Sequence, residues 1–166
     1  AGPIAIIGGT GAGAFPPGGE GATEHVTIPT PWGDARAERG RLRGRDVLFV
    51  ARHGAGHRIP PHRIAHRANV AALARLGVRA ALATAAVGGL RADLAPGTLV
   101  LLDDLIDFTR GRETCTFFER QVVHTDLSAP YSPPLRAAIA DAARAAGIPL
   151  LLRGTYLCAD GPRYET

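Results

Sequence analysis

The sequence predicts an α/β fold in which a central mixed β-sheet is flanked by helices. Short apolar runs rich in branched residues, typical of buried strands, recur along the chain and end in glycine-rich turns. Between them lie two segments with apolar residues at helical spacing, His62 to Leu76 and Ser132 to Gly147. Strands that alternate with helices favour a layered arrangement around one sheet.

Each element has its own local signal. The first helix is expected to end at Gly77, and the second to open at Ser132-Pro133 and close at Gly147. The sequence around "TPWGD" alternates loosely and indicates a hairpin. The expected strands are residues 3–9, the hairpin over 24–43, then 46–52, 78–90, 97–107 and a last strand that begins at Pro149.

Length and composition limit the class of protein. The 166 residues carry no repeat and no linker-like segment, so we expect one domain over residues 1–166. The net charge is +4 and all 19 cationic residues are arginine, but they are scattered, which argues against a nucleic-acid partner. The two cysteines form no disulfide or zinc pattern, and no apolar run of membrane-spanning length or signal peptide is present. A cytoplasmic, soluble protein without a membrane partner is expected.

Three glycine-rich loops follow predicted strands: "GGTGAG" at residues 8–13, "RHGAGH" at 52–57 and "TAAVGG" at 84–89. In open α/β sheets, ligands collect at the carboxyl ends of the strands, so these loops could converge. The first loop is neither a dinucleotide fingerprint, because Phe15-Pro16-Pro17 forbids the following helix, nor a Walker A loop, because the chain has no lysine. It remains a turn that could direct backbone N–H groups and the Thr10 hydroxyl at a small anion, or a purely structural turn.

Arg52 directly follows an apolar strand. A guanidinium binds phosphate in a bidentate manner and is costly to bury without an anionic partner, so Arg52 either binds an anion or pairs with a carboxylate of the core.

The histidines at 53, 57, 62 and 66 raise the possibility of a metal site. His62 and His66 have helical i, i+4 spacing, but no glutamate and no third ligand accompany them, so we predict no metal.

The last residues, "GPRYET", combine an aromatic ring with a carboxylate. Tyr164 could stack on a planar heterocycle while Glu165 accepts a hydrogen bond from it. An ionised carboxylate accepts but cannot donate, so it suits a 6-oxopurine, whose N1–H is a donor, and opposes a 6-aminopurine. The alternative is a solvated glutamate beside a tyrosine that packs.

Several segments occur together in this order: "IIGGTG", "ARHGAGHRIPPHR", "RANVAAL", "AVGG", "IDFTRGRETCTFF", "VVHTDLSAPYSPPLR" and "GTYLCADGPRYET". In this combination the sequence resembles the trimeric purine nucleoside phosphorylases, and most closely their methylthioadenosine and methylthioinosine phosphorylase branch. The resemblance runs through essentially the whole chain.

The resemblance implies phosphorolysis, in which phosphate attacks the anomeric carbon of a nucleoside and releases the base and a ribose 1-phosphate. It implies no cofactor, since inorganic phosphate is a co-substrate. The phosphate site would comprise Gly9, Thr10, Arg52, His53 and the backbone of Ala85 and Ala86. No catalytic residue is assigned.

For the nucleoside, the resemblance implies that Tyr164 and Glu165 belong to the base pocket and that His124 reaches a neighbouring subunit's site in a homotrimer. Glu165 favours a 6-oxopurine substrate, such as inosine, guanosine or S-methyl-5′-thioinosine. Ala85 departs from the family, which often carries Asn or Thr there, and so does Ala65-His66 in "IAHRAN", where "NYRAN" is common.

The family continues beyond the "GPR" motif into a helix, a strand with a methionine that contacts the ribose, and a loop that binds the purine N7. We therefore expect this chain to lack the C-terminal part of the family domain. The alternatives are a 5′-methylthioadenosine phosphorylase, a non-catalytic phosphate- or nucleoside-binding fragment, or a metal-dependent hydrolase that uses the histidines between His53 and His66.

Overall fold

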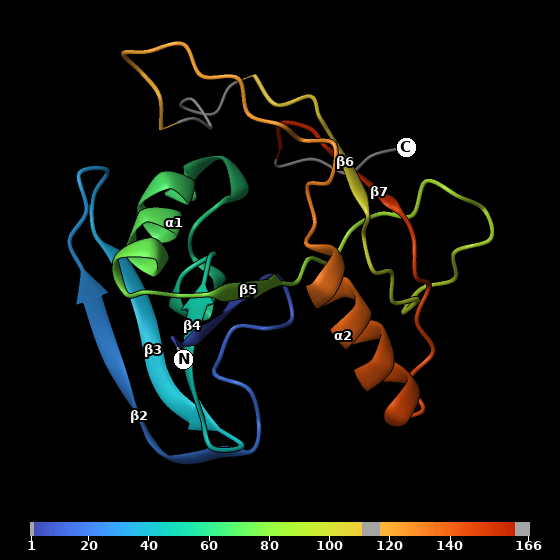
Figure 1. Cartoon of the computed structure of the whole chain (residues 1–166), viewed down its shortest axis with the longest axis horizontal. Helices are drawn as coiled ribbons and strands as arrows, with labels where there is room; N and C mark the ends of the chain where they lie inside the picture. The colour runs from blue at the N-terminus through green and yellow to red at the C-terminus, as the bar shows by residue number, and fades with distance from the viewer. Residues whose placement is uncertain (1, 111–116, 162–166) are drawn as a thin grey trace. The chain divides into compact units, whose positions relative to one another are not determined.

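The computed structural model describes residues 2–110 and 117–161, and its chain path is shown in Figure 1. The backbone gathers into two compact units, residues 2–87 with Phe117, and residues 88–110 with 118–161. Each unit is described by itself below. The expectation of one domain over residues 1–166 stays a prediction.

The first unit is built on a five-stranded mixed sheet with the order β2-β3-β4-β1-β5. Strands β2, β3 and β4 are antiparallel, whereas β1 pairs parallel to both β4 and β5. This confirms the predicted α/β class with a mixed sheet. The strands span Ile4–Gly8 (β1), Gly19–Ile28 (β2), Ala35–Leu42 (β3), Arg45–Ala51 (β4) and Ala80–Ala83 (β5).

The predicted helix over residues 62–76 is split in two. A 3-10 turn, η2, covers Pro61–Arg63, and the α-helix α1 covers only His66–Arg75, because Ile64 between them has extended dihedral angles. Another 3-10 turn, η1, spans Ala55–His57. As expected, Gly77 follows the end of α1, and its φ of 71° lies in the left-handed region that glycine adopts without strain.

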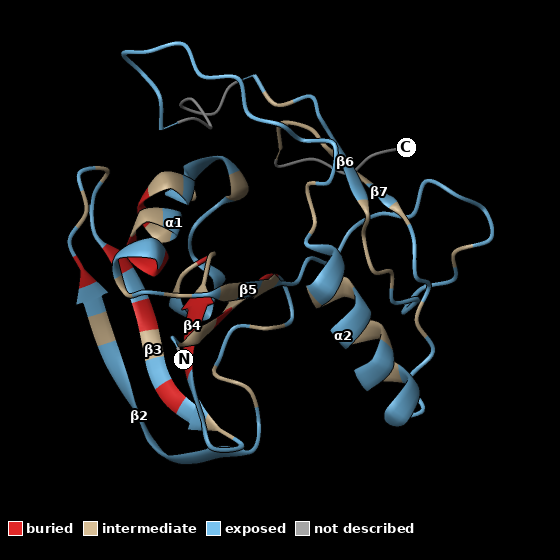
Figure 2. Ribbon diagram, in the orientation of Figure 1, coloured by how far each residue is buried: buried red, intermediate tan, exposed pale blue. Residues whose placement is uncertain are grey.

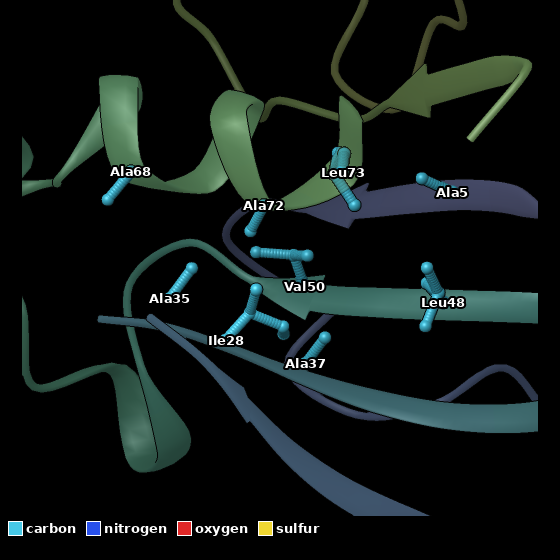
Figure 3. Close-up of a cluster of buried hydrophobic side chains, with 9 residues drawn as sticks. All are labelled: Ala5, Ile28, Ala35, Ala37, Leu48, Val50, Ala68, Ala72 and Leu73. Carbon is cyan, nitrogen blue, oxygen red and sulfur yellow. The ribbon is translucent and has the colours of Figure 1, made fainter. Parts of the chain in front are cut away.

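Most of the buried apolar side chains of the first unit belong to one cluster between α1 and the sheet (Figure 2). Figure 3 shows Ala72 and Leu73 of α1 turned toward Val50 and Leu48 of β4, and Ala68 of the same helix belongs to the same cluster. The rest of this cluster comes from the strands, namely Ala5, Ile28, Ala35 and Ala37. Small side chains on both the helix and the sheet allow the two backbones to approach closely, which explains the alanine-rich composition of α1.

Strand β4 is buried along Val47 to Val50, which agrees with the apolar run in its sequence. Beside the hairpin, the ring of Phe15 lies against backbone that has no side chain. A Cβ placed at Gly40 of β3 would lie 2.8 Å from Cζ of Phe15, and one at Gly19 would lie 3.1 Å from the same ring. The proline-rich segment after β1 is therefore anchored on the hairpin.

The second unit contains helix α2, Pro133–Ala145, and a two-stranded parallel sheet of β6, Asp104–Asp107, and β7, Thr155–Cys158. Helix α2 agrees with the predicted segment, and Gly147, which has a φ of 66°, follows its C-cap residue. The predicted strand over 97–107 is shorter than expected, since only an isolated bridge between Val100 and Leu151 precedes β6.

Polar contacts connect the elements of the second unit. Arg136 of α2 donates from Nε to the carbonyl oxygen of Leu102 at 2.8 Å, and from Nη2 to that of Leu152. Asp103 accepts from Nε of Arg153 at 2.7 Å and from the amide of Gly154 at 3.0 Å. The bonds of Arg136 join α2 to the segments that precede β6 and β7, and the bonds of Asp103 join these two segments to each other.

Candidate functional site

The carboxyl ends of β4, β1 and β5 lie side by side in the first unit. The three strands are parallel neighbours, with Gly8 opposite Ala51 and Ile7 opposite Ala83. The residues that follow them therefore emerge at one edge of the sheet, which is where open α/β sheets bind ligands. The convergence predicted for the three glycine-rich loops is what the sheet register produces.

The loop after β1 turns sharply back. The amide of Ala12 donates to the carbonyl oxygen of Gly9 at 3.0 Å, and Gly11 has a φ of 85°. Gly9 itself is buried, and its amide donates to Oγ1 of Thr84 at 3.2 Å. Of the backbone donors expected to face an anion, the Gly9 N–H is thus already bound to a side chain, whereas Thr10 is exposed.

Arg52 is half-buried directly after β4. Its amide donates to the carbonyl oxygen of Gly8 at 3.3 Å, which extends the strand ladder by one residue. Its Nη1 donates to the carbonyl oxygen of Thr84 at 2.5 Å. The guanidinium is therefore held across the ends of all three strands.

His53 is the one buried polar side chain recorded in the described residues, with an exposed fraction of 7%. Its Nδ1 lies 2.9 Å from the carbonyl oxygen of Ile59. A carbonyl can only accept, so Nδ1 carries the proton and Nε2 is the second ring nitrogen available for chemistry. The His53 ring stacks on His57, with centroids 4.3 Å apart and an interplanar angle of 29°.

A cavity of about 260 Å³ opens at these loops. It could hold several water molecules or a small tetrahedral anion, since one water takes up roughly 30 Å³ of liquid. Its lining comes from the loops after β1 and β4, and comprises Gly8, Gly9, Thr10, Gly11, Ala12, Gly13, Ala51, His53, Gly54, Gly56 and His57.

The structure thus brings together most of the predicted anion-binding residues. Gly9, Thr10 and His53 line the cavity. Arg52 contacts the adjoining end of β5 through Thr84, and the exposed residues Ala85 and Ala86 follow Thr84 in the chain. Whether they bind phosphate stays a prediction.

None of the predicted nucleoside-binding residues lines this cavity in the described part of the chain. Tyr164 and Glu165 lie outside the described residues. His124 is an exposed residue of the second unit. Within residues 2–110 and 117–161, no three His, Cys, Asp or Glu side chains group as ligands for a metal ion.

Sequence reasoning missed Thr84, which contacts both Gly9 and Arg52. The loop that it opens was singled out, but roles were given only to the two alanines that follow. The signal that could have singled out Thr84 is a hydroxyl directly after an apolar strand, the position that Arg52 takes after its own strand.

The chain belongs to the Phosphorylase superfamily, whose family profile matches residues 3–166. Over 166 residues it is 45% identical to a "Probable 6-oxopurine nucleoside phosphorylase" of Dictyoglomus turgidum, covering 98% of this chain and 62% of that protein. It is 44% identical to the "6-oxopurine nucleoside phosphorylase" of Pyrococcus furiosus and 41% to an "S-methyl-5′-thioadenosine phosphorylase" of Pyrococcus abyssi, with 98% of this chain covered and 63% of each relative.

The fold agrees with this membership. Methylthioadenosine phosphorylase from Schistosoma mansoni, solved in complex with tubercidin, superimposes with a TM-score of 0.91 at 30% identity, covering 100% of this chain and 66% of the other. The chain therefore spans somewhat less than two thirds of the length of these relatives. The family resemblance predicted from the sequence is confirmed.

No helix in the described part of the chain is both long and apolar enough to cross a membrane.

Proposed function

We propose that the protein to which this chain belongs is a purine nucleoside phosphorylase that cleaves 6-oxopurine nucleosides with inorganic phosphate. The observation that carries the proposal is a cavity at the strand ends that is lined by the glycine loop and His53, with the Arg52 guanidinium held across the ends of the same strands. The relatives at 45% and 44% identity are named for 6-oxopurine nucleosides, which supports the same substrate class.

In the proposed reaction, phosphate itself is the nucleophile, so no side chain of the protein forms a covalent bond with the substrate. A phosphate oxygen attacks the anomeric carbon as the bond to the purine nitrogen breaks, and the electron pair of that bond leaves with the base. The sugar passes through an oxocarbenium-like state, so an anion held beside it both positions the nucleophile and stabilises the positive charge. Arg52 supplies the positive charge that holds this anion, and Thr10 and His53 supply polar atoms at the cavity wall.

The substrate base is proposed from Glu165. A carboxylate at the N1 edge of the purine accepts from a 6-oxopurine and faces a lone pair in a 6-aminopurine. The proposed substrates carry either a hydroxyl or a methylthio group at the 5′ position. In the same proposal, Tyr164 stacks on the base, no cofactor takes part, and the protein acts in the cytoplasm as a homotrimer in which His124 reaches a neighbouring site.

A second candidate is a 5′-methylthioadenosine phosphorylase. It is favoured by the relative at 41% identity and by the structural similarity to the Schistosoma mansoni enzyme. The two candidates differ in the purine that is released, so one assay separates them.

The test is base release by the full-length gene product from inosine, guanosine, S-methyl-5′-thioinosine and 5′-methylthioadenosine, each with and without phosphate. We expect phosphate-dependent release, at least tenfold faster by kcat/KM for the 6-oxopurines than for 5′-methylthioadenosine. Faster release of adenine would favour the second candidate. Release that is independent of phosphate would exclude both.

Two variants assign the roles of the residues. Arg52→Ala should raise the KM for phosphate at least tenfold, whereas Arg63→Ala, an exposed arginine in η2, should leave it unchanged. Glu165→Ser should narrow or reverse the preference for 6-oxopurines. An unchanged ratio of 6-oxo to 6-amino rates would exclude the proposed role of Glu165.

A further inference from the structure

Thr84 contacts both of the loops that flank its own strand end. Its amide donates to the carbonyl oxygen of Ile7 at 3.0 Å and so continues the β1–β5 pairing by one residue. Its side-chain Oγ1 accepts from the amide of Gly9 at 3.2 Å. Its carbonyl oxygen accepts from Nη1 of Arg52 at 2.5 Å. One residue thus connects the ends of β1, β4 and β5.

Gly9 and Arg52 also contact each other closely. A Cβ placed on Gly9 would lie 2.5 Å from Nη2 of Arg52 and 2.4 Å from the carbonyl oxygen of Thr84. The guanidinium therefore lies against the bare backbone of Gly9. Any rotation of the Gly9 peptide would move the surface on which the guanidinium rests.

The hydroxyl of Thr84 is suited to prevent that rotation. It offers two lone pairs and one donor, so it can accept from the Gly9 amide and still use its own hydrogen elsewhere. The carbonyl group of the same residue fixes the guanidinium by a charge-assisted bond. A guanidinium that is already held in one orientation loses less side-chain entropy when it binds an anion.

We propose that Thr84 is a positioning residue of the anion site: its hydroxyl fixes the Gly9 peptide and its carbonyl fixes Arg52, so that the guanidinium is set for phosphate. The inference rests on the proposed function in taking phosphate as the ligand. Thr84 does not line the cavity itself, and it acts through Gly9 and Arg52.

The test compares Thr84→Val, which keeps the shape and removes the hydroxyl, with Thr84→Ser, which restores it. The matched control is Thr27→Val, at an exposed threonine of β2 in the same sheet. In the full-length protein, the dissociation constant for inorganic phosphate is measured by calorimetry, and the KM values for phosphate and inosine by steady-state kinetics.

We expect Thr84→Val to raise both the dissociation constant and the KM for phosphate roughly tenfold, the effect of losing one hydrogen bond in a scaffold that holds a charged group. The KM for inosine should stay within about twofold, because the hydroxyl acts on the anion side alone. Thr84→Ser should bind phosphate like the wild type, and so should Thr27→Val.

Three results would overturn the proposal: unchanged phosphate binding in Thr84→Val, equal losses for phosphate and inosine, or failure of the serine variant to restore binding. If Thr84→Val does not fold, Thr84→Ala replaces it, and failure of both to fold would assign the hydroxyl to stability instead. Phosphate binding weakened by Thr84→Val in a protein without turnover would leave this inference standing while the proposed function fails. Turnover that is indifferent to Thr84→Val would do the reverse.

Discussion

Strand β4 of the first unit and strand β7 of the second are both apolar runs in the sequence, yet they are packed very differently. Val47 to Val50 of β4 are each at most 4% exposed, and two of them, Leu48 and Val50, belong to the cluster that includes the buried residues of α1. No residue of β7 is buried, and the same holds for every described residue of the second unit. An apolar run therefore predicts a strand, but the burial of that strand depends on what packs against it.

The two units consequently depend on different forces. The first rests on apolar area removed from water, the larger of the two contributions to folding. The second rests on strand pairing and on side chains that bind carbonyl oxygens, each of which contributes little net free energy. Substitutions should therefore differ in size between the units in a predictable order.

The largest effect is expected in the core of the first unit. Leu48→Ala removes a fully buried side chain from β4 and should lower the free energy of unfolding by about 3 kcal/mol, from lost transfer free energy and the cavity left behind. Urea unfolding followed by fluorescence measures it, since Trp32 is the sole tryptophan of the chain and packs against this core.

The matched control is Leu105→Ala in β6, where the leucine is 37% exposed. We expect a loss below about 1 kcal/mol there. Equal losses at the two positions would contradict the comparison between the units.

An intermediate effect is expected at Arg136 of α2. Arg136→Ala leaves the carbonyl oxygens of Leu102 and Leu152 without their donor and should cost about 1 to 2 kcal/mol. The loss should appear as faster amide hydrogen exchange in β6 and β7, with exchange in β1 and β4 unchanged.

Arg144→Ala on the same helix is the control, because Arg144 is exposed and its guanidinium pairs with the exposed Asp141 of the same helix. Such surface pairs contribute little. If both arginine variants exchanged at the same rate, the bridging role of Arg136 would be excluded.

The smallest effect concerns pH. The hydrogen bond from Arg153, with that from the Gly154 amide, lowers the pKa of Asp103 below its ordinary value of 3.8. Because the folded pKa is the lower one, protonation favours the unfolded state. The contribution to stability is complete above pH 3.8 and is lost as the pH falls through the folded value.

Asp103→Asn should therefore reduce the dependence of stability on pH below pH 4. Near neutral pH, the dependence of stability on pH should hardly change. Thermal unfolding between pH 2 and pH 6 measures this. An unaltered slope below pH 4 in the asparagine variant would show that Asp103 contributes nothing to the acid transition.

Much of the fold could be predicted from local pattern. The strands β1 and β4 and helix α2 agree with the sequence because each is long enough, or sharply enough bounded by glycine and proline, to be specified by its own residues. The split before α1 was not predicted, since the extended conformation of Ile64 depends on its surroundings and leaves no compositional trace. The sequence likewise predicted one strand over residues 97–107, whereas only Asp104–Asp107 form β6, because the length of a strand also depends on its surroundings.

The site was predictable to the level of loops. Glycines and an arginine after apolar strands indicated an anion site, and parallel strand order brought them together. Sequence could not indicate that the Gly9 amide is bound to Thr84, because that bond spans 75 residues and arises only from the register of β1 against β5.

The ring of Phe15 against Gly40 has a consequence for how the two positions can vary. A Cβ at Gly40 would meet only side-chain atoms among its nearest neighbours, the ring of Phe15 and the methyl of Thr23, and the backbone of Gly40 is not in the left-handed region. An alanine is thus excluded there by its neighbour and not by its own torsion angles. Positions 15 and 40 should show epistasis: a shorter side chain at 15 would make a larger residue at 40 tolerable, and homologues that lose the aromatic ring should be those that lose the glycine.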